Sequence, residues 1–268
     1  LAVKYRKIDE DGHVLGGPFY YIESGMGHKW RWLAKIFAFF GACVGLMGIG
    51  TFTQVNGIAS AVQAFFDPDK ANTVSILGND YSIAIVITAF ILAILVGLVV
   101  IGGIQRISKV SQVIVPFMAV LYIVVCLVLI IVNINKVPAA FATIVKCAFK
   151  PMSFAGGVTA SLAIAMQKGV ARGIFSNEAG LGSAPIAAAA AQTKEPVRQG
   201  LVSMTGTFID TIIICTMTGL SIVLTGAWKV EGLQGVQVTT YAFNEGLPIP
   251  ATISSFLLML CLVFFAFT

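Results

Sequence analysis

The stretch that decides the fold is GVARGIFSNEAGLGS, residues 169–183, which separates two apolar segments of the chain. It combines four glycines with Ser176, Asn177 and Glu178, and such a sequence forms a poor continuous helix. Unwound main chain is tolerated at membrane depth only where protein or a water-filled cavity satisfies its polar groups. We therefore expect residues 155–193 to form a broken membrane helix that presents main-chain groups to a ligand. An ordinary polar loop between two helices, or a re-entrant hairpin, is the alternative.

The composition of the whole chain places that stretch in a membrane protein. Of the 268 residues, 57% are hydrophobic and 11% are charged, against roughly 45–50% and 25% in an average soluble domain. Four charge-free runs exceed the ~20 residues that cross a bilayer: Ile36–Phe66, Ser82–Gln105, Val110–Asn135 and Gly246–Thr268. With the interrupted segments Pro151–Thr193 and Gln199–Trp228, they predict an all-α integral membrane protein of about six spans. Pro138–Phe149 is too short to cross and resembles an interfacial helix.

The basic residues indicate how these spans are oriented. The net charge of +5 is spread between apolar runs, so it does not predict a nucleic-acid partner. Ten Lys and Arg residues fall in the loops on the N-terminal side of the membrane and five in the opposite loops, with Lys168 and Arg172 inside the broken span. This excess predicts that residues 1–35 are cytoplasmic in a multi-pass protein of the cell membrane.

Enzymatic chemistry has little support in the residues. Both histidines, His13 and His28, lie in one polar segment, and the five cysteines are scattered without CxxC spacing. An intramembrane enzyme would have to use Glu178 or Asp210 as its acid or base, without a partner histidine. We therefore expect neither an enzyme nor a cofactor.

The first charge-free run carries a polar group without an obvious structural role. At about 100° per residue, Gly50, Gln54 and Gly57 share one face of a helix. A carboxamide beside two glycines offers a donor and an acceptor in a hollow, which suits a zwitterionic or amide-bearing ligand. A hydrogen bond that holds two helices together is the alternative, and the sequence slightly favours it.

A carboxylate lies within the fifth span. Asp210 falls on a stripe about 100° wide, together with Ser203, Thr207, Thr211 and Thr218. An ionisable group in a span costs roughly 2.5–3.5 kcal/mol and usually marks an ion or substrate route. Hydroxyl and carboxylate oxygens suit a hard cation such as sodium. The alternative is that Asp210 lies nearer the cytoplasm and pairs with Arg198 or Lys194.

Several stretches together resemble a known family. LAVKYR (1–6), GGPFYYIESGMG (16–27), GVARGIFSNEAGLGSAPIAAAAAQT (169–193) and PVRQGLVSMTGTFIDTIIICT (196–216) are similar to the alanine/glycine:cation symporter family. The resemblance implies a LeuT-like inverted-repeat transporter fold. It also implies that this chain is a fragment, a single truncated transporter domain over 1–268 that holds the third to eighth helices of the core.

The resemblance also implies a binding site. The substrate, a small neutral amino acid such as alanine or glycine, would contact Ile49, Gly50, Gln54, Phe175, Ser176, Asn177 and Glu178. Sodium, the coupling ion, would bind at Thr268, with a second site at Thr207, Asp210 and Thr211. The family commonly has Gly-Asn-Met-Val-Gln where this chain has Gly50-Thr-Phe-Thr-Gln54, which leaves the pocket size open.

These observations predict a sodium-coupled symporter that works by alternating access. Its other partner is the lipid bilayer, and we expect a monomer. A channel-like pore for a small polar solute or ion is the competing function, because it needs the same polar interior but no alternation between two conformers.

Overall fold

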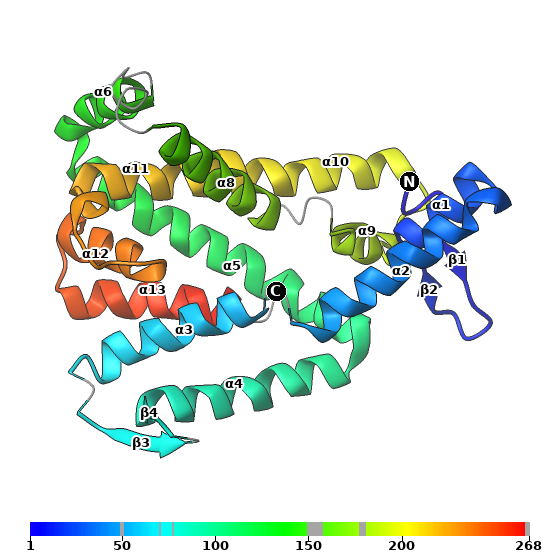
Figure 1. Cartoon of the computed structure of the whole chain (residues 1–268), viewed down its shortest axis with the longest axis horizontal. Helices are drawn as coiled ribbons and strands as arrows, with labels where there is room; N and C mark the ends of the chain where they lie inside the picture. Colours follow the sequence, from blue (N-terminus) through cyan, green and yellow to red (C-terminus); the bar gives the residue numbers. More distant parts are fainter. Residues whose placement is uncertain (49–50, 70, 77, 149–157, 177–180, 266–268) are drawn as a thin grey trace. The chain divides into compact units, whose positions relative to one another are not determined.

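The computed structural model describes residues 1–48, 51–69, 71–76, 78–148, 158–176 and 181–265, and their regular structure is mostly helical (Figure 1). The chain divides into two compact units, each described below by itself. Unit 1 comprises Leu1–Ile49 and Pro151–Ile213, and unit 2 comprises Gly50–Lys150 and Ile214–Thr268. The helical architecture confirms the expected class, whereas the LeuT-like topology stays a prediction.

Unit 1 begins with a small hairpin and continues in helices. Its elements are β1 (Lys7–Ile8), β2 (Val14–Leu15), α1 (Pro18–Met26), η1 (His28–Trp30), α2 (Arg31–Leu46), α8 (Val158–Ser176), α9 (Ser183–Ala189), α10 (Pro196–Thr207) and η3 (Phe208–Ile214), of which the last residue, Ile214, belongs to unit 2. The strands β1 and β2 are antiparallel. Pro18 is the first residue of α1, where the amide hydrogen that proline lacks would have no helical partner. Helix α1 packs on α2, and α9 contacts β2.

Unit 2 is a helical bundle with a hairpin. Its elements are α3 (Thr51–Phe66), β3 (Thr73–Ile76), β4 (Asn79–Ser82), α4 (Ile83–Ile101), α5 (Gly103–Val132), η2 (Ile134–Lys136), α6 (Val137–Ala148), α11 (Cys215–Thr225), η4 (Ala227–Lys229), α12 (Val236–Gly246) and α13 (Ala251–Phe265). Helix α13 packs on α3, α5 and α12. Cys126, Leu129 and Phe243 are at most 1% exposed and form the centre of the core.

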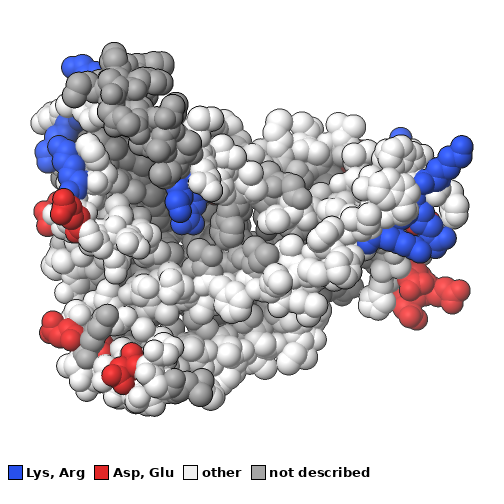
Figure 2. Space-filling view, in the orientation of Figure 1, with Lys and Arg blue, Asp and Glu red and all other residues white. Residues whose placement is uncertain are grey.

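Three helices in the described part of the chain are long and apolar enough to cross a membrane: Ile83–Ile101, Gln105–Val132 and Pro196–Thr225. They correspond to the second, third and fifth predicted spans. Helix α4 exposes Phe90, Ile94 and Leu98, which are 71%, 57% and 52% accessible. Exposed apolar surface of this kind marks contact with lipid or protein. Much of the face in Figure 2 likewise carries no charged side chain.

The other predicted spans are shorter or interrupted. The run Ile36–Phe66 is not one helix, because α2 ends at Leu46 and α3 begins at Thr51. Gly48 ends the first helix with a φ of 60°, a left-handed conformation that glycine adopts without strain. The last run is helical over Ala251–Phe265. The Pro138–Phe149 segment is helical as α6, and its interfacial position stays a prediction.

The glycine-rich stretch of residues 169–183 is helical over its first half. Helix α8 continues through Gly169 to Ser176, so the unwinding that we expected from residue 169 onward is wrong for residues 169–176. Gly182 then has a φ of 76°, and α9 starts at Ser183. Residues 177–180 lie outside the described part of the chain. The broken membrane helix over 155–193, and a single domain over 1–268, therefore stay predictions.

Candidate functional site

Two predicted site residues from different segments meet in unit 1. The hydroxyl of Ser176, the last residue of α8, donates a short hydrogen bond to Oδ2 of Asp210. Ser176 is exposed and Asp210 is half-buried. The contact joins the end of α8, where the candidate substrate stretch lies, to the carboxylate within the apolar helix Pro196–Thr225.

Asp210 lies in an unusual piece of main chain. Residues Phe208–Ile214 form a π-helix between the α-helical segments α10 and α11. A π-helical turn bonds residue i to i+5, is rare, and occurs frequently at functional sites inside α-helices. The stripe that we derived with 100° per residue therefore does not hold across residues 208–214, because the π-helix changes the angular spacing of the side chains.

The members of that stripe accordingly have separate environments. The Thr207 hydroxyl donates to the carbonyl of Ser203 at 3.4 Å, and Ser203 Oγ lies 3.5 Å from Gln199 Nε2. Thr218 belongs to unit 2, where its hydroxyl lies 2.6 Å from that of Tyr122. Thr218 therefore packs in unit 2, and we no longer count it among the candidate ion ligands.

The proposed alternative for Asp210 does not occur in the described part of the chain. The ion pair found there joins Arg31 to Glu23 at 3.4 Å, between two partly exposed side chains. Asp210 bonds Ser176 instead of Arg198 or Lys194. A carboxylate with a hydroxyl neighbour is an oxygen-rich environment of the kind that hard cations prefer. Among the described residues, no three His, Cys, Asp or Glu side chains gather as a metal site.

The remaining predicted substrate residues are only partly described. Gln54 is half-buried in α3, and its face neighbour Gly57 packs against α12, since a methyl group on Gly57 would lie 3.2 Å from Val236 Cγ2. Gln54 belongs to unit 2, so its meeting with Ser176 stays a prediction. Ile49, Gly50, Asn177, Glu178 and Thr268, and the side chain of Phe175, lie outside the described part. Thr211 is exposed.

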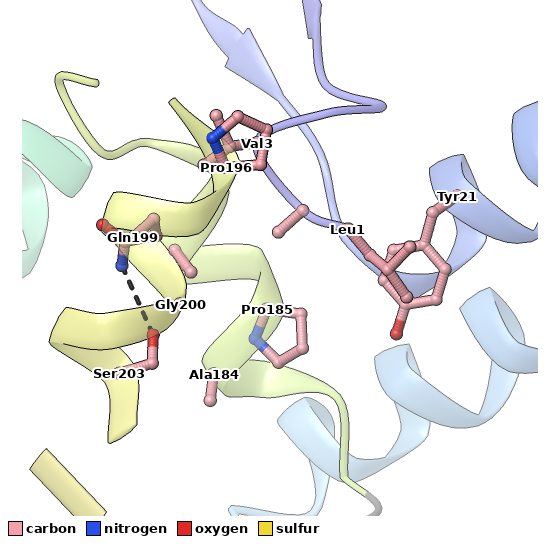
Figure 3. A pocket seen from close by; sticks show the side chains of 11 residues that line it. Leu1, Val3, Tyr21, Ala184, Pro185, Pro196, Gln199, Gly200 and Ser203 are labelled. Carbon is pink, nitrogen blue, oxygen red and sulfur yellow. Dashed lines mark hydrogen bonds between the residues drawn. The ribbon is translucent and has the colours of Figure 1, made fainter. Parts of the chain in front are cut away.

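A cavity of about 320 Å³ lies elsewhere in unit 1 (Figure 3). Its polar side chains are Gln199 and Ser203 on one side and Tyr21 on the other, with Pro185 between them. Burial raises the pKa of the Tyr21 phenol above its ordinary value. Of the stripe that carries Asp210 the cavity contains only Ser203, it contains none of the predicted substrate residues, and its lining is mostly apolar. The Ser176–Asp210 contact is therefore the better candidate site.

Known proteins resemble this chain over its whole length. A model of the sodium:alanine symporter family matches residues 1–268, the whole chain. The chain belongs to the sodium:alanine symporter family. An uncharacterized transporter of Haemophilus influenzae is 54% identical over all of the chain and 55% of that protein. The sodium/alanine symporter AgcS of Methanococcus maripaludis is 44% identical, with the same coverage. The probable sodium/glutamine symporter GlnT of Bacillus subtilis is 38% identical over 98% of the chain and 50% of that protein.

This family membership confirms the resemblance read from the sequence. The chain spans about half the length of these curated relatives. The family and relatives carry the names of transporters, so the intramembrane enzyme is excluded. The assignment of this symporter-family chain to the membrane rests on the same names and on its apolar helices.

Two features of the site escaped the sequence. The residues indicated Ser176 for substrate and Asp210 for sodium, but not that the two side chains bond each other. The π-helix was also missed, because the apolar residues around Asp210 carry no signal that distinguishes i+4 from i+5 bonding. The sequence offered one hint of this contact: Ser176 ends one apolar segment, and Asp210 lies within another.

Proposed function

We propose that this protein is a sodium-coupled symporter that carries a small neutral amino acid, alanine or glycine, across the cell membrane by alternating access. It works as a monomer, with residues 1–35 in the cytoplasm. The amino acid binds at Ile49, Gly50, Gln54 and the stretch Phe175–Glu178. Sodium binds at Thr268 and at a second site formed by Thr207, Asp210 and Thr211.

The hydrogen bond between Ser176 and Asp210 is the observation that carries this proposal. A carboxylate within an apolar helix is costly and is retained where it serves a transport route. Here it contacts the residue at which α8 ends, directly before the candidate substrate stretch. The contact thus provides a physical connection between an ion-binding group and a substrate-binding segment.

Coupling follows from competition for the carboxylate oxygens. A cation at Asp210 would take lone pairs that now accept the Ser176 hydroxyl, so its arrival changes the constraint on the end of α8. A ligand shifts a conformational equilibrium only through different affinities for the two states. Symport therefore requires that sodium and the amino acid both favour the same conformer, and the Ser176–Asp210 pair is where that preference is transmitted.

The test is uptake of radiolabelled alanine and glycine by vesicles that contain the complete protein, under an inward sodium gradient. Saturable accumulation should be lost when choline replaces sodium. Asp210→Asn should raise the sodium concentration for half-maximal uptake at least about tenfold, equivalent to about 1.4 kcal/mol. Gln54→Ala should abolish saturable uptake without loss of membrane expression.

Thr205→Val is a matched control for these variants. Thr205 is an exposed residue of α10 whose hydroxyl donates a hydrogen bond to the carbonyl of Leu201 at 2.9 Å. It should leave the sodium dependence unchanged. Ohmic currents without substrate, in place of saturable accumulation, would instead establish the channel-like pore. Wild-type sodium dependence in Asp210→Asn would remove the second ion site.

A further inference from the structure

The first residues of the chain hold the end of a distant helix. Nη1 of Arg6 donates hydrogen bonds to the carbonyls of Ala189 at 2.8 Å and Ala191 at 2.6 Å. Nη2 of the same side chain donates to the carbonyl of Thr193 at 2.7 Å. One half-buried guanidinium therefore binds three main-chain oxygens, all in unit 1. Arg6, near the start of the chain, is thus folded against the end of α9.

The arrangement fits the needs of both partners. Helix α9 ends at Ala189, and the last carbonyls of a helix have no partner within it. A positive charge is also favoured at a helix C-terminus. The planar guanidinium carries five N–H donors in a fixed fork, whereas a lysine would present one compact ammonium. The guanidinium fork therefore serves three separate carbonyls with donors whose directions are fixed, which an ammonium group does not reproduce.

Close packing fixes α9 at both ends. A methyl group on Gly16 would lie 2.3 Å from Cβ of Ala189, so these two main chains nearly touch at the end of the helix. At the start, a methyl group on Gly182 would lie 2.3 Å from the ring of Phe37 and 2.8 Å from Pro18. Such spacing leaves no room for an added methyl group between α9 and these neighbours.

The contact also agrees with the predicted orientation. Arg6 and Thr193 can bond only if the segments that contain them lie on the same side of the membrane. The count of basic residues placed both in the cytoplasmic set of loops. The hydrogen bonds thus support the placement of both segments on one side of the membrane, and the assignment of that side to the cytoplasm stays a prediction.

We propose that Arg6 is a positioning residue that keeps α9 joined to residues 6–18, so that they move as one body during transport; this inference rests on the proposed function. Helix α9 follows the candidate substrate stretch, and its attachment sets where the C-terminal side of that stretch is held. The hydrogen bonds of the Arg6 guanidinium all go to main-chain carbonyls. Its loss should therefore slow the conformational step and leave the binding of amino acid unchanged.

Kinetics of uptake test this role. Arg6→Ala should lower the maximal rate of alanine uptake at least about tenfold, with KM changed by less than about twofold. Arg6→Lys, which keeps the charge but not the fork, should restore part of the rate. A wild-type maximal rate in Arg6→Ala, or a raised KM with an unchanged rate, would overturn the proposal.

A second pair of variants does not depend on Arg6 at all. Gly16→Ala alone should slow uptake, because its methyl group meets Ala189. The double variant Gly16→Ala with Ala189→Gly moves that methyl group from one side of the contact to the other and should recover the rate. Gly41→Ala is the matched control, since a methyl group there meets nothing within 4 Å. A double variant no faster than Gly16→Ala would argue against the contact in the working protein.

Labelling separates this inference from the proposed function. In protein whose native cysteines are replaced, the thiol of Ala191→Cys should react with a maleimide at least about fivefold faster when Arg6→Ala is added, because the segment after α9 is released. This measurement needs no transport. Absent uptake in the wild type with faster labelling would refute the symporter and keep the attachment, whereas unchanged labelling would refute the attachment.

Discussion

Gly246→Ala should destabilise unit 2 although it adds only one methyl group. Gly246 is the buried last residue of α12, and its carbonyl accepts a hydrogen bond from Asn133 Nδ2 at 2.9 Å. A methyl group there would lie 2.8 Å from Cδ1 and Cγ of Leu129 and from Cγ2 of Thr225. Carbon atoms prefer separations of about 3.5–4.0 Å. Leu129 is 0% exposed and cannot move into solvent.

The size of the effect can be worked out against a matched glycine. Forcing an extra methyl group into a packed core costs about 1–3 kcal/mol. Replacing glycine by alanine in a helix also gains about 0.5–1 kcal/mol from the entropy of the unfolded chain. Gly219 in α11 is exposed, and a methyl group there meets nothing within 4 Å. Both substitutions replace glycine by alanine in a helix and share that entropic gain. Gly246→Ala should therefore be less stable than Gly219→Ala by about 1–3 kcal/mol, the cost of the added methyl group in the core.

Two native thiols report the unfolding of this unit. Cys126 is 0% exposed and Cys261 is 6% exposed, so a thiol-reactive dye reaches them only when the bundle opens. The more accessible thiols of Cys43, Cys147 and Cys215 are blocked first. During heating in detergent, Gly246→Ala should label at a lower temperature than Gly219→Ala. Equal or reversed labelling temperatures would show that the side chains of Leu129 and Thr225 move aside at no cost, and that the tight contact does not constrain the fold.

Three further predictions use the same assay or a titration. Phe243→Ala, at a side chain 1% exposed, should cost about 3–5 kcal/mol; a midpoint within 1 °C of wild type would contradict the assigned core. Ser82→Ala removes the hydroxyl that lies 2.5 Å from the buried Asp67 carboxylate and should lower the free energy of unfolding by about 1–3 kcal/mol. Ser82→Thr keeps a hydroxyl and should cost less. Equal losses of stability in the two variants would mean that the hydroxyl does not stabilise Asp67. Burial raises the pKa of Tyr21, so folding favours the protonated phenol. The resulting contribution to the free energy of unfolding is complete below the ordinary tyrosine pKa of 10.0 and is lost as pH rises through the raised pKa. Unfolding midpoints measured across about pH 9–12 should fall less steeply in Tyr21→Phe than in wild type, and parallel curves would exclude the linkage.

The individual residues Ser176 and Asp210 could be predicted, because a local sequence pattern is enough to identify each of them. The glycines of residues 169–183 and the acid in an apolar helix depart from what lipid tolerates, and that departure is visible residue by residue. Such patterns identified Ser176 and Asp210 singly. They placed the two residues in different sites, because side-chain contact between helices depends on how the helices pack.

The sequence by itself determined the membrane class, the family and the approximate positions of the apolar helices. These follow from quantities that survive in any conformation: the number of charges, the length of charge-free runs and the order of the motif residues. The tertiary structure decided that Arg6 caps α9, that Ser176 bonds Asp210, and that a π-helix shifts the face on which Asp210 lies. Each of these depends on main-chain geometry or on atoms that meet across long sequence separations, and only close packing of the folded chain selects one such arrangement from the many that the same pattern allows.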